Sequence, residues 1–211
     1  MMIEEKEKII EYGLKIVNEN LTKGTGGNLS IFNREEGVFA ITPSAIPYNE
    51  IEADDIAIID LEGNQISGNR RPSSEVDLHR IFYKNRDDIN SVIHTHTTYA
   101  TTLSCLNWDL PAVHYMVALA GENVRCAEYA TYGTEELAEN AYEAMKDRRA
   151  VLLANHGLLA GGKDIENAFS ITEEIEYCAE LYIKAKSIGR PVILSKEEMI
   201  HMMEKFKTYR R

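Results

Sequence analysis

The chain has 211 residues, of which 44% are apolar and 27% are charged, and it contains only 13 Gly and 5 Pro. This composition is typical of a globular protein long enough for one domain, and it excludes disordered and fibrous classes. The net charge of −11 disfavours general binding to a nucleic-acid backbone but permits a small phosphorylated ligand.

The cysteines and the apolar runs indicate the cellular setting. Cys105, Cys126 and Cys178 are widely spaced and include no C-x-x-C pair, so neither a disulfide framework nor a zinc knuckle is predicted. The charged N-terminus differs from a signal peptide, and the apolar runs are far shorter than the ~20 residues of a membrane span. We therefore expect a cytoplasmic protein that binds neither nucleic acid nor a membrane.

The first half of the chain mixes helical and strand-like patterns. Residues 1–18 repeat apolar side chains on one face and predict an amphipathic helix. Alternating or short apolar runs predict strands at 29–32, 37–41, 56–60 and 65–67. Residues 69–85 switch to a helix, because Pro72 precedes an apolar stripe and Ser73 or Ser74 can cap its first turn.

The second half begins with another strand signal. Residues 91–96 alternate like a strand and lead into a helix from about residue 97, and residues 112–116 predict a short strand. A further helix is expected to begin at Thr134. Residues 150–155 read as a buried strand that ends in a Gly-rich loop, NHGLLAGG.

Two capping patterns mark the last helices. Asp164 is expected to cap a long helix, and Ser195 with Glu198 forms a capping box for the final one. No repeat or low-complexity linker divides the chain. The pattern predicts one α/β domain over residues 1–211.

The first candidate for chemistry is the pair His94 and His96. On a strand, residues i and i+2 face the same side, so two imidazoles would lie together as zinc ligands. His156, at the end of a buried strand, is the candidate third ligand. Taken alone, the pair is better explained as two polar residues at a strand end.

The second candidate is the segment PSSE at 72–75. A helix N-terminus attracts anions, so Ser73 and Ser74 could bind a phosphate beside the Glu75 carboxylate. Helix capping alone would also explain these residues. His79 lies one turn later on the same face, where a partner for a carboxylate or for the core is the simpler interpretation.

The third candidate is the loop GTGGN at 24–28, whose backbone N–H groups could hold an oxyanion. It lacks the G-K-[ST] of a P-loop, and Leu29 stands where a dinucleotide fingerprint needs Gly. Two tyrosines are also candidates. Tyr115 and Tyr209 could be interface or core aromatics, and Tyr209 continues the apolar stripe of its helix.

In chain order, the segments GTGGNLS, TPSAIPY, RPSSE, HTH, HYM, YATYGT, NHGL and EKFKTY resemble the class II aldolase family. That family includes fuculose-phosphate aldolases, the nearest match, and ribulose-phosphate 4-epimerases. The resemblance spans about residues 9–209 and implies a three-layer α/β domain with a mostly antiparallel central sheet and helices on both faces. It also implies reversible cleavage of L-fuculose 1-phosphate to dihydroxyacetone phosphate and L-lactaldehyde through a metal-stabilised enediolate.

The resemblance further assigns roles to individual residues. His94, His96 and His156 would hold Zn²⁺ or another divalent ion such as Mn²⁺, Co²⁺ or Fe²⁺, and Glu75 would be the catalytic carboxylate that can also touch the metal at rest. Substrate and phosphate binding is assigned to Gly27, Asn28, Ser44, Ala45, Ser73 and Ser74. Tyr115 and Tyr209 would be catalytic tyrosines that reach the active site of a neighbouring subunit in a homotetramer.

One departure and several alternatives stay open. Position 45 is Ala where relatives often carry Gly, which could tighten the approach to phosphate. A 4-epimerase breaks the same bond, but such enzymes carry Asp where this chain has Glu75. A dehydratase of methylthioribulose phosphate, a non-catalytic relative and a nucleotide-binding oxidoreductase are weaker alternatives.

Overall fold

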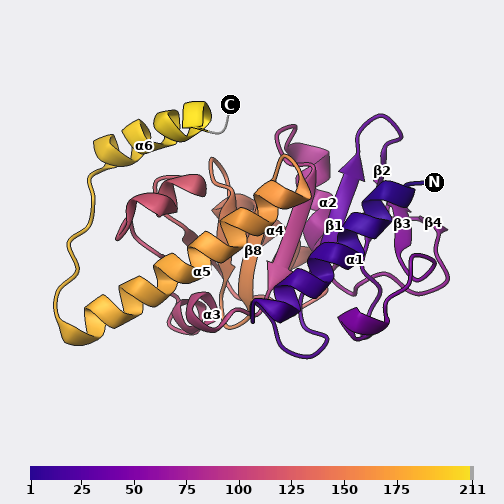
Figure 1. The fold of residues 1–211 in the computed structure, drawn as a ribbon, viewed down its shortest axis with the longest axis horizontal. Helices are drawn as coiled ribbons and strands as arrows, with labels where there is room; N and C mark the ends of the chain where they lie inside the picture. The colour runs from indigo at the N-terminus through magenta and orange to yellow at the C-terminus, as the bar shows by residue number, and fades with distance from the viewer. Residues whose placement is uncertain (210–211) are drawn as a thin grey trace.

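A computed structural model describes residues 1–209 and the side chains as far as residue 208. These residues build one eight-stranded sheet in the order β4-β3-β2-β1-β5-β8-β7-β6 (Figure 1). The strands are β1(Asn28–Asn33), β2(Val38–Ile41), β3(Ala57–Asp60), β4(Gln65–Ser67), β5(Ser91–Thr95), β6(Arg125–Ala127), β7(Ala150–Leu153) and β8(Gly157–Gly162). The helices are α1(Ile3–Asn18), η1(Tyr48–Glu50), α2(Val76–Asn85), α3(Thr98–Ser104), η2(Tyr115–Leu119), α4(Glu135–Ala144), α5(Ile165–Ile188) and α6(Lys196–Tyr209).

Neighbouring strands pair antiparallel except β6 and β7, which are parallel. The mixed α/β class and the mostly antiparallel central sheet are therefore confirmed. Strand alternation puts Leu29 on the face covered by α1, whereas Phe32 faces α2. α2 and α4 cover one face, and α1, α3 and α5 cover the other, with α1 and α5 side by side across the near face in Figure 1.

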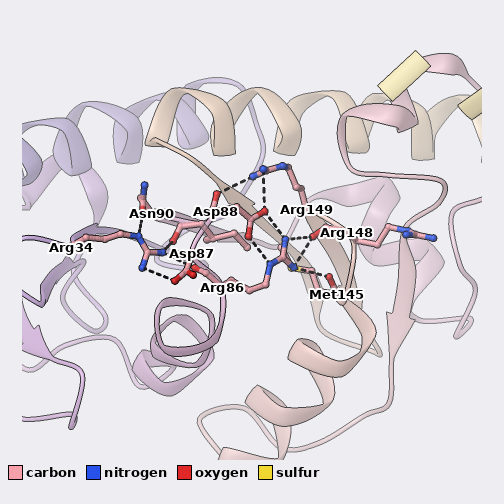
Figure 2. A network of polar contacts seen from close by, with 9 residues as sticks. Arg34, Arg86, Asp87, Asp88, Asn90, Met145, Arg148 and Arg149 are labelled. Atoms are coloured by element: carbon pink, nitrogen blue, oxygen red, sulfur yellow. Dashed lines mark hydrogen bonds and ion pairs between the residues drawn. The ribbon is translucent and has the colours of Figure 1, made fainter. Parts of the chain in front are cut away.

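A network of arginine contacts fixes the C-terminal end of α2 (Figure 2). Arg86 donates hydrogen bonds to the backbone carbonyls of Met145 and Arg148, and it forms an ion pair with Asp88 at 2.7 Å. Arg149 pairs with the same aspartate at 3.1 Å. These contacts join the loop between α2 and β5 to the segment that leads into β7, so they fix the position of α2 relative to the sheet.

The predicted helix caps are confirmed where the bonds are local. Thr134 Oγ1 accepts from the backbone N–H of Leu137, and Asp164 Oδ1 accepts from the backbone N–H of Asn167 at 2.7 Å. Ser195 Oγ likewise accepts from the N–H of Glu198. Each of these bonds satisfies a donor that the first helical turn leaves free.

Two predicted elements are wrong. Residues 112–116 do not form a strand, since η2 begins at Tyr115. The Gly-rich segment after His156 is not a loop but the strand β8. Its last glycines are explained by close packing: a Cβ on Gly161 would lie 2.8 Å from Ile89, and one on Gly162 would lie 2.8 Å from the Asp164 carbonyl.

The start of α2 is also corrected. The helix begins at Val76, with Glu75 at the cap position, and neither Ser73 nor Ser74 caps it. Instead, Ser73 Oγ accepts from the N–H of Glu75 at 3.2 Å in a turn just before the helix. Within residues 1–209, no helix is both long enough and apolar enough to cross a membrane.

Candidate active site

Three imidazoles converge at one end of the sheet. His94 lies on β5, His96 follows that strand, and His156 lies in the tight turn between β7 and β8. Asn155 makes this turn possible because it adopts a left-handed backbone conformation, with φ 53°. One nitrogen from each ring lies within 4.8 Å of the others, so the three predicted ligands are brought together.

The buried histidine is oriented by the neighbouring strand. His94 Nδ1–H donates to the Leu158 carbonyl at 2.9 Å, which turns the lone pair of Nε2 toward His96 Nε2, 3.1 Å away. Burial lowers the pKa of His94 to about 4, and burial also lowers the pKa of His96. Both rings are therefore neutral at pH 7, the form that binds a metal ion.

Glu75 closes the fourth side of this group. Its Oε2 lies 3.4 Å from His94 Nε2, and its Oε1 lies 3.4 Å from His156 Nε2. The Asn28 amide donates to Oε2 at 2.9 Å, whereas buried Oε1 has no hydrogen-bond partner among the described residues. Burial opposes ionisation, but the two imidazoles and the Asn28 amide together lower the pKa of Glu75 below its ordinary value.

These positions fit a divalent ion. Bonds of about 2.0–2.1 Å to ligands at tetrahedral angles would place ligand atoms about 3.3 Å apart. The distances between Glu75 and the histidines are 3.4 Å, and the distance between His94 and His96 is 3.1 Å. Imidazole nitrogens with a buried, unpartnered carboxylate oxygen are the donor set expected for such an ion.

Two glycines allow the chain to come this close. Gly27 has φ 78°, and a Cβ there would lie 2.5 Å from the His94 carbonyl. At Gly157, a Cβ would lie 3.1 Å from a carbon of both His94 and His96. Side chains at these positions would separate the segments that carry the site.

The residues predicted to bind phosphate gather beside Glu75. The Ser44 N–H donates to the Arg71 carbonyl at 3.1 Å, and the Ser73 N–H donates to the Thr42 carbonyl at 3.0 Å. These bonds hold residues 42–45 alongside 71–75, with Ser44, Ala45 and Ser74 exposed. The grouping suits a phosphate ligand, and the phosphate role of these residues stays a prediction.

The departure at position 45 has a backbone cause. Ala45 has φ 58°, a left-handed conformation that Gly adopts without the steric cost of a Cβ. Its side chain is exposed, so the substitution strains the backbone and does not crowd the interior. This conformation explains why Gly suits the position.

The two tyrosines predicted to be catalytic belong to η2 and α6. Tyr115 begins η2 and is 45% exposed, and its ring centroid is 6.3 Å from that of Phe206 on α6. Tyr209 ends α6, and its side chain lies outside the described part of the chain. The catalytic roles of these tyrosines stay predictions.

Sequence reasoning missed the depth of the polar contacts behind Glu75. Asn28, predicted as a phosphate ligand, is only 4% exposed, and its amide already bonds Glu75 and His79. His79, interpreted as a core or carboxylate partner, is fully buried and bonds both Asn28 and Ser30. The usable signal was the alternation of Asn28 and Ser30 on a strand, which places both on one face.

Comparisons with known proteins show the family of the chain. Residues 7–183 match the model of the class II aldolase and adducin N-terminal domain family. The chain is 53% identical over 209 residues to a 5-deoxy-D-ribulose 1-phosphate aldolase from Bacillus thuringiensis serovar kurstaki, with 99% of this chain and 98% of that one covered. It is 42% identical over 204 residues to an L-fuculose phosphate aldolase from Escherichia coli K12, with 96% and 94% covered.

The chain is also similar to a solved structure of an L-fuculose 1-phosphate aldolase. The two superpose with a TM-score of 0.96 at 59% identity, covering 97% of this chain and 96% of that one. The chain therefore belongs to the class II aldolase family and is an aldolase lyase.

Proposed function

We propose that the protein is a divalent-metal-dependent aldolase that cleaves L-fuculose 1-phosphate to dihydroxyacetone phosphate and L-lactaldehyde. The observation that carries this proposal is the Glu75 carboxylate held 3.4 Å from both His94 and His156. The exposed serines of segments 42–45 and 71–75 lie beside that carboxylate. A proton-transfer group, a metal-ligand set and hydroxyl donors for a phosphate therefore adjoin one another.

The residues of this chain would divide the work of the reaction. A divalent ion held by His94, His96 and His156 would supply Lewis-acid stabilisation of the negative charge that develops on the substrate oxygens. Cleavage of C3–C4 leaves an electron pair on C3 and releases the proton of the C4 hydroxyl, whose oxygen becomes the aldehyde oxygen. Glu75, ionised at rest, would take up that proton and deliver it to C3 through its unpartnered Oε1. Serine hydroxyls and backbone N–H groups around Ser74 would hold the phosphate and so fix which carbon faces Glu75.

A second substrate has support from a specific relative. The 53% identical protein is named a 5-deoxy-D-ribulose 1-phosphate aldolase. That ketose shares carbons C1 to C3 with fuculose 1-phosphate and differs in the aldehyde half, from which it would yield acetaldehyde. The site around Glu75 addresses the shared half, so both ketose phosphates suit it, and 5-deoxy-D-ribulose 1-phosphate is our second candidate.

Assembly is proposed on the position of Tyr115. This half-exposed tyrosine lies on the surface near α6, as a side chain that serves a neighbouring copy would. We propose a homotetramer in which Tyr115 of one copy exchanges a proton with the aldehyde oxygen in the site of the next. Light scattering on a sizing column measures the mass, and a monomer would contradict the assembly.

The test of function is release of dihydroxyacetone phosphate from each ketose phosphate, coupled to glycerol-phosphate dehydrogenase. Release that a chelator stops and Zn²⁺, Mn²⁺ or Co²⁺ restores is expected, and the ratio of kcat/KM assigns the substrate. Glu75→Gln should lower kcat by about 10²–10⁴-fold while metal content is unchanged. Glu62→Gln, on an exposed turn, is the matched control and should keep full activity. No release from metal-replete protein with either substrate would refute the proposal.

A further inference from the structure

A buried chain of polar side chains runs from Glu75 into the protein between β1 and α2. Strand alternation puts Asn28 and Ser30 on the same face of β1. Four-residue spacing puts Glu75, His79 and Tyr83 on one face of α2 and its cap. The side chains of these two faces contact one another. Asn28 bonds Glu75 at 2.9 Å and His79 at 2.5 Å, and Ser30 bonds His79 at 2.6 Å and Tyr83 at 2.5 Å.

This row of hydrogen-bonded side chains is buried away from solvent, and its end at Tyr83 is held in place by packing. His79 and Ser30 are 0% exposed, and Tyr83 is 2% exposed. The Tyr83 ring stacks on Phe32 with a centroid distance of 4.9 Å, which holds its hydroxyl at Ser30. Burial lowers the pKa of His79 to about 3, so its ring is neutral at pH 7 and carries one N–H and one lone pair.

The donors and acceptors of this chain can be assigned from the Glu75 end. An ionised carboxylate only accepts, so Asn28 turns its NH₂ toward Glu75 and its carbonyl oxygen toward His79. His79 Nε2 must then carry the N–H that donates to Asn28, and His79 Nδ1 accepts from the Ser30 hydroxyl. Ser30 Oγ in turn accepts from the Tyr83 hydroxyl. Every bond runs in one direction, toward the carboxylate.

We propose that His79 is a positioning residue that fixes the Asn28 amide and, through it, the orientation of the Glu75 carboxylate. This inference rests on the proposed function of Glu75. If Nε2–H did not occupy the Asn28 carbonyl, the amide could rotate and present its oxygen to Glu75, where two acceptors would repel. Holding Oε2 leaves Oε1 directed into the site, and small losses of orientation cost catalytic rate.

Matched substitutions test the role. His79→Leu removes both nitrogens, whereas His79→Gln retains an N–H near the position of Nε2. We expect His79→Leu to lower kcat by about 10- to 100-fold with KM and bound metal nearly unchanged, and His79→Gln to recover most of that loss. Phe82→Leu changes a buried residue of the same helix that takes no part in these hydrogen bonds, so it should lower Tm but keep kcat.

Two results would overturn this role. One is wild-type kcat in His79→Leu, and the other is an equal loss of kcat in Phe82→Leu at the same loss of stability. If His79→Leu does not fold, Ser30→Ala supplies the test: without the hydroxyl donor, His79 is free to take the Nδ1–H form, so kcat should fall. Unchanged kcat in a folded Ser30→Ala protein would refute the directed chain.

An imidazole ¹⁵N spectrum of wild-type protein tests the chain without any substrate. The Nε2–H tautomer is expected for His79, and Ser30→Ala should introduce the Nδ1–H tautomer. Nδ1–H in the wild type would refute the directed chain even if the enzyme is active. If instead no ketose phosphate is cleaved and the tautomers are as expected, the proposed function fails while the hydrogen-bond chain stands.

Discussion

Gly157 is a position where one added methyl group should disturb the candidate metal site. A Cβ there would overlap the Thr95 carbonyl oxygen and lie 3.1 Å from carbons of both His94 and His96. Its φ is not in the left-handed region, so Gly157→Ala acts through contact alone. Relief of the overlap requires β8 to move away from β5 by on the order of 1 Å, because ordinary contacts are about 3.5 Å.

That movement is several times larger than metal ligation tolerates. Ligand distances in a working site hold to about 0.2 Å, and His156, adjacent to Gly157, would move with β8. We expect Gly157→Ala to weaken metal binding by at least about tenfold, and overpacking to lower the free energy of unfolding by roughly 1–3 kcal/mol.

Metal-free protein titrated with Zn²⁺ against a competing chelator measures the affinity, and denaturant unfolding measures the stability. Gly189→Ala is the matched control, because Gly189 has an extended backbone with nothing within 4 Å of a Cβ, and both quantities should be unchanged there. Wild-type zinc affinity in Gly157→Ala would refute the argument that close strand approach builds the site.

Three other changes address stability. Glu176 accepts the backbone N–H groups of Tyr99 and Ala100, both at 2.8 Å, so Glu176→Ala should cost about 1–3 kcal/mol in denaturant unfolding, and no loss would show that water replaces the carboxylate. His79 has its pKa lowered from 6.5 to about 3 by burial, so below pH 6.5 the unfolded chain binds a proton that the folded chain does not. Stability therefore falls as pH falls, and between pH 6.5 and 5 metal-free wild type should lose about 2 kcal/mol more than His79→Gln; equal losses would contradict a buried neutral ring. Ala45→Gly removes an alanine from a left-handed backbone conformation. It should raise the free energy of unfolding by up to about 1 kcal/mol and so raise Tm slightly, whereas a fall in Tm would contradict the strain at this residue.

The candidate site was partly visible in the sequence. The spacing of His94 and His96 follows from strand geometry, and both rings do face one centre with His156. The role of Asn28 was not visible in that way. Its register opposite His94 and its bond to Glu75, 47 residues away, depend on strand pairing and on how α2 crosses the sheet.

The sequence alone determined the features that depend on interactions between residues close together in the chain. The long helix α5 was predicted to begin at an Asp164 cap, and the structure shows that cap as one short-range hydrogen bond to the N–H of Asn167. These features involve residues within one or two turns of each other, so the sequence contains their whole cause.

The tertiary structure decided the features whose causes lie far apart in the chain. Gly161 and Gly162 looked like loop residues, but they are glycines because Ile89, Met145 and the start of α5 leave no room for a Cβ against β8. The directed hydrogen bonds from Tyr83 to Glu75 likewise exist only because β1 and α2 bring two polar rows together. Packing between distant segments sets those distances, and periodicity and local propensity carry no information about it.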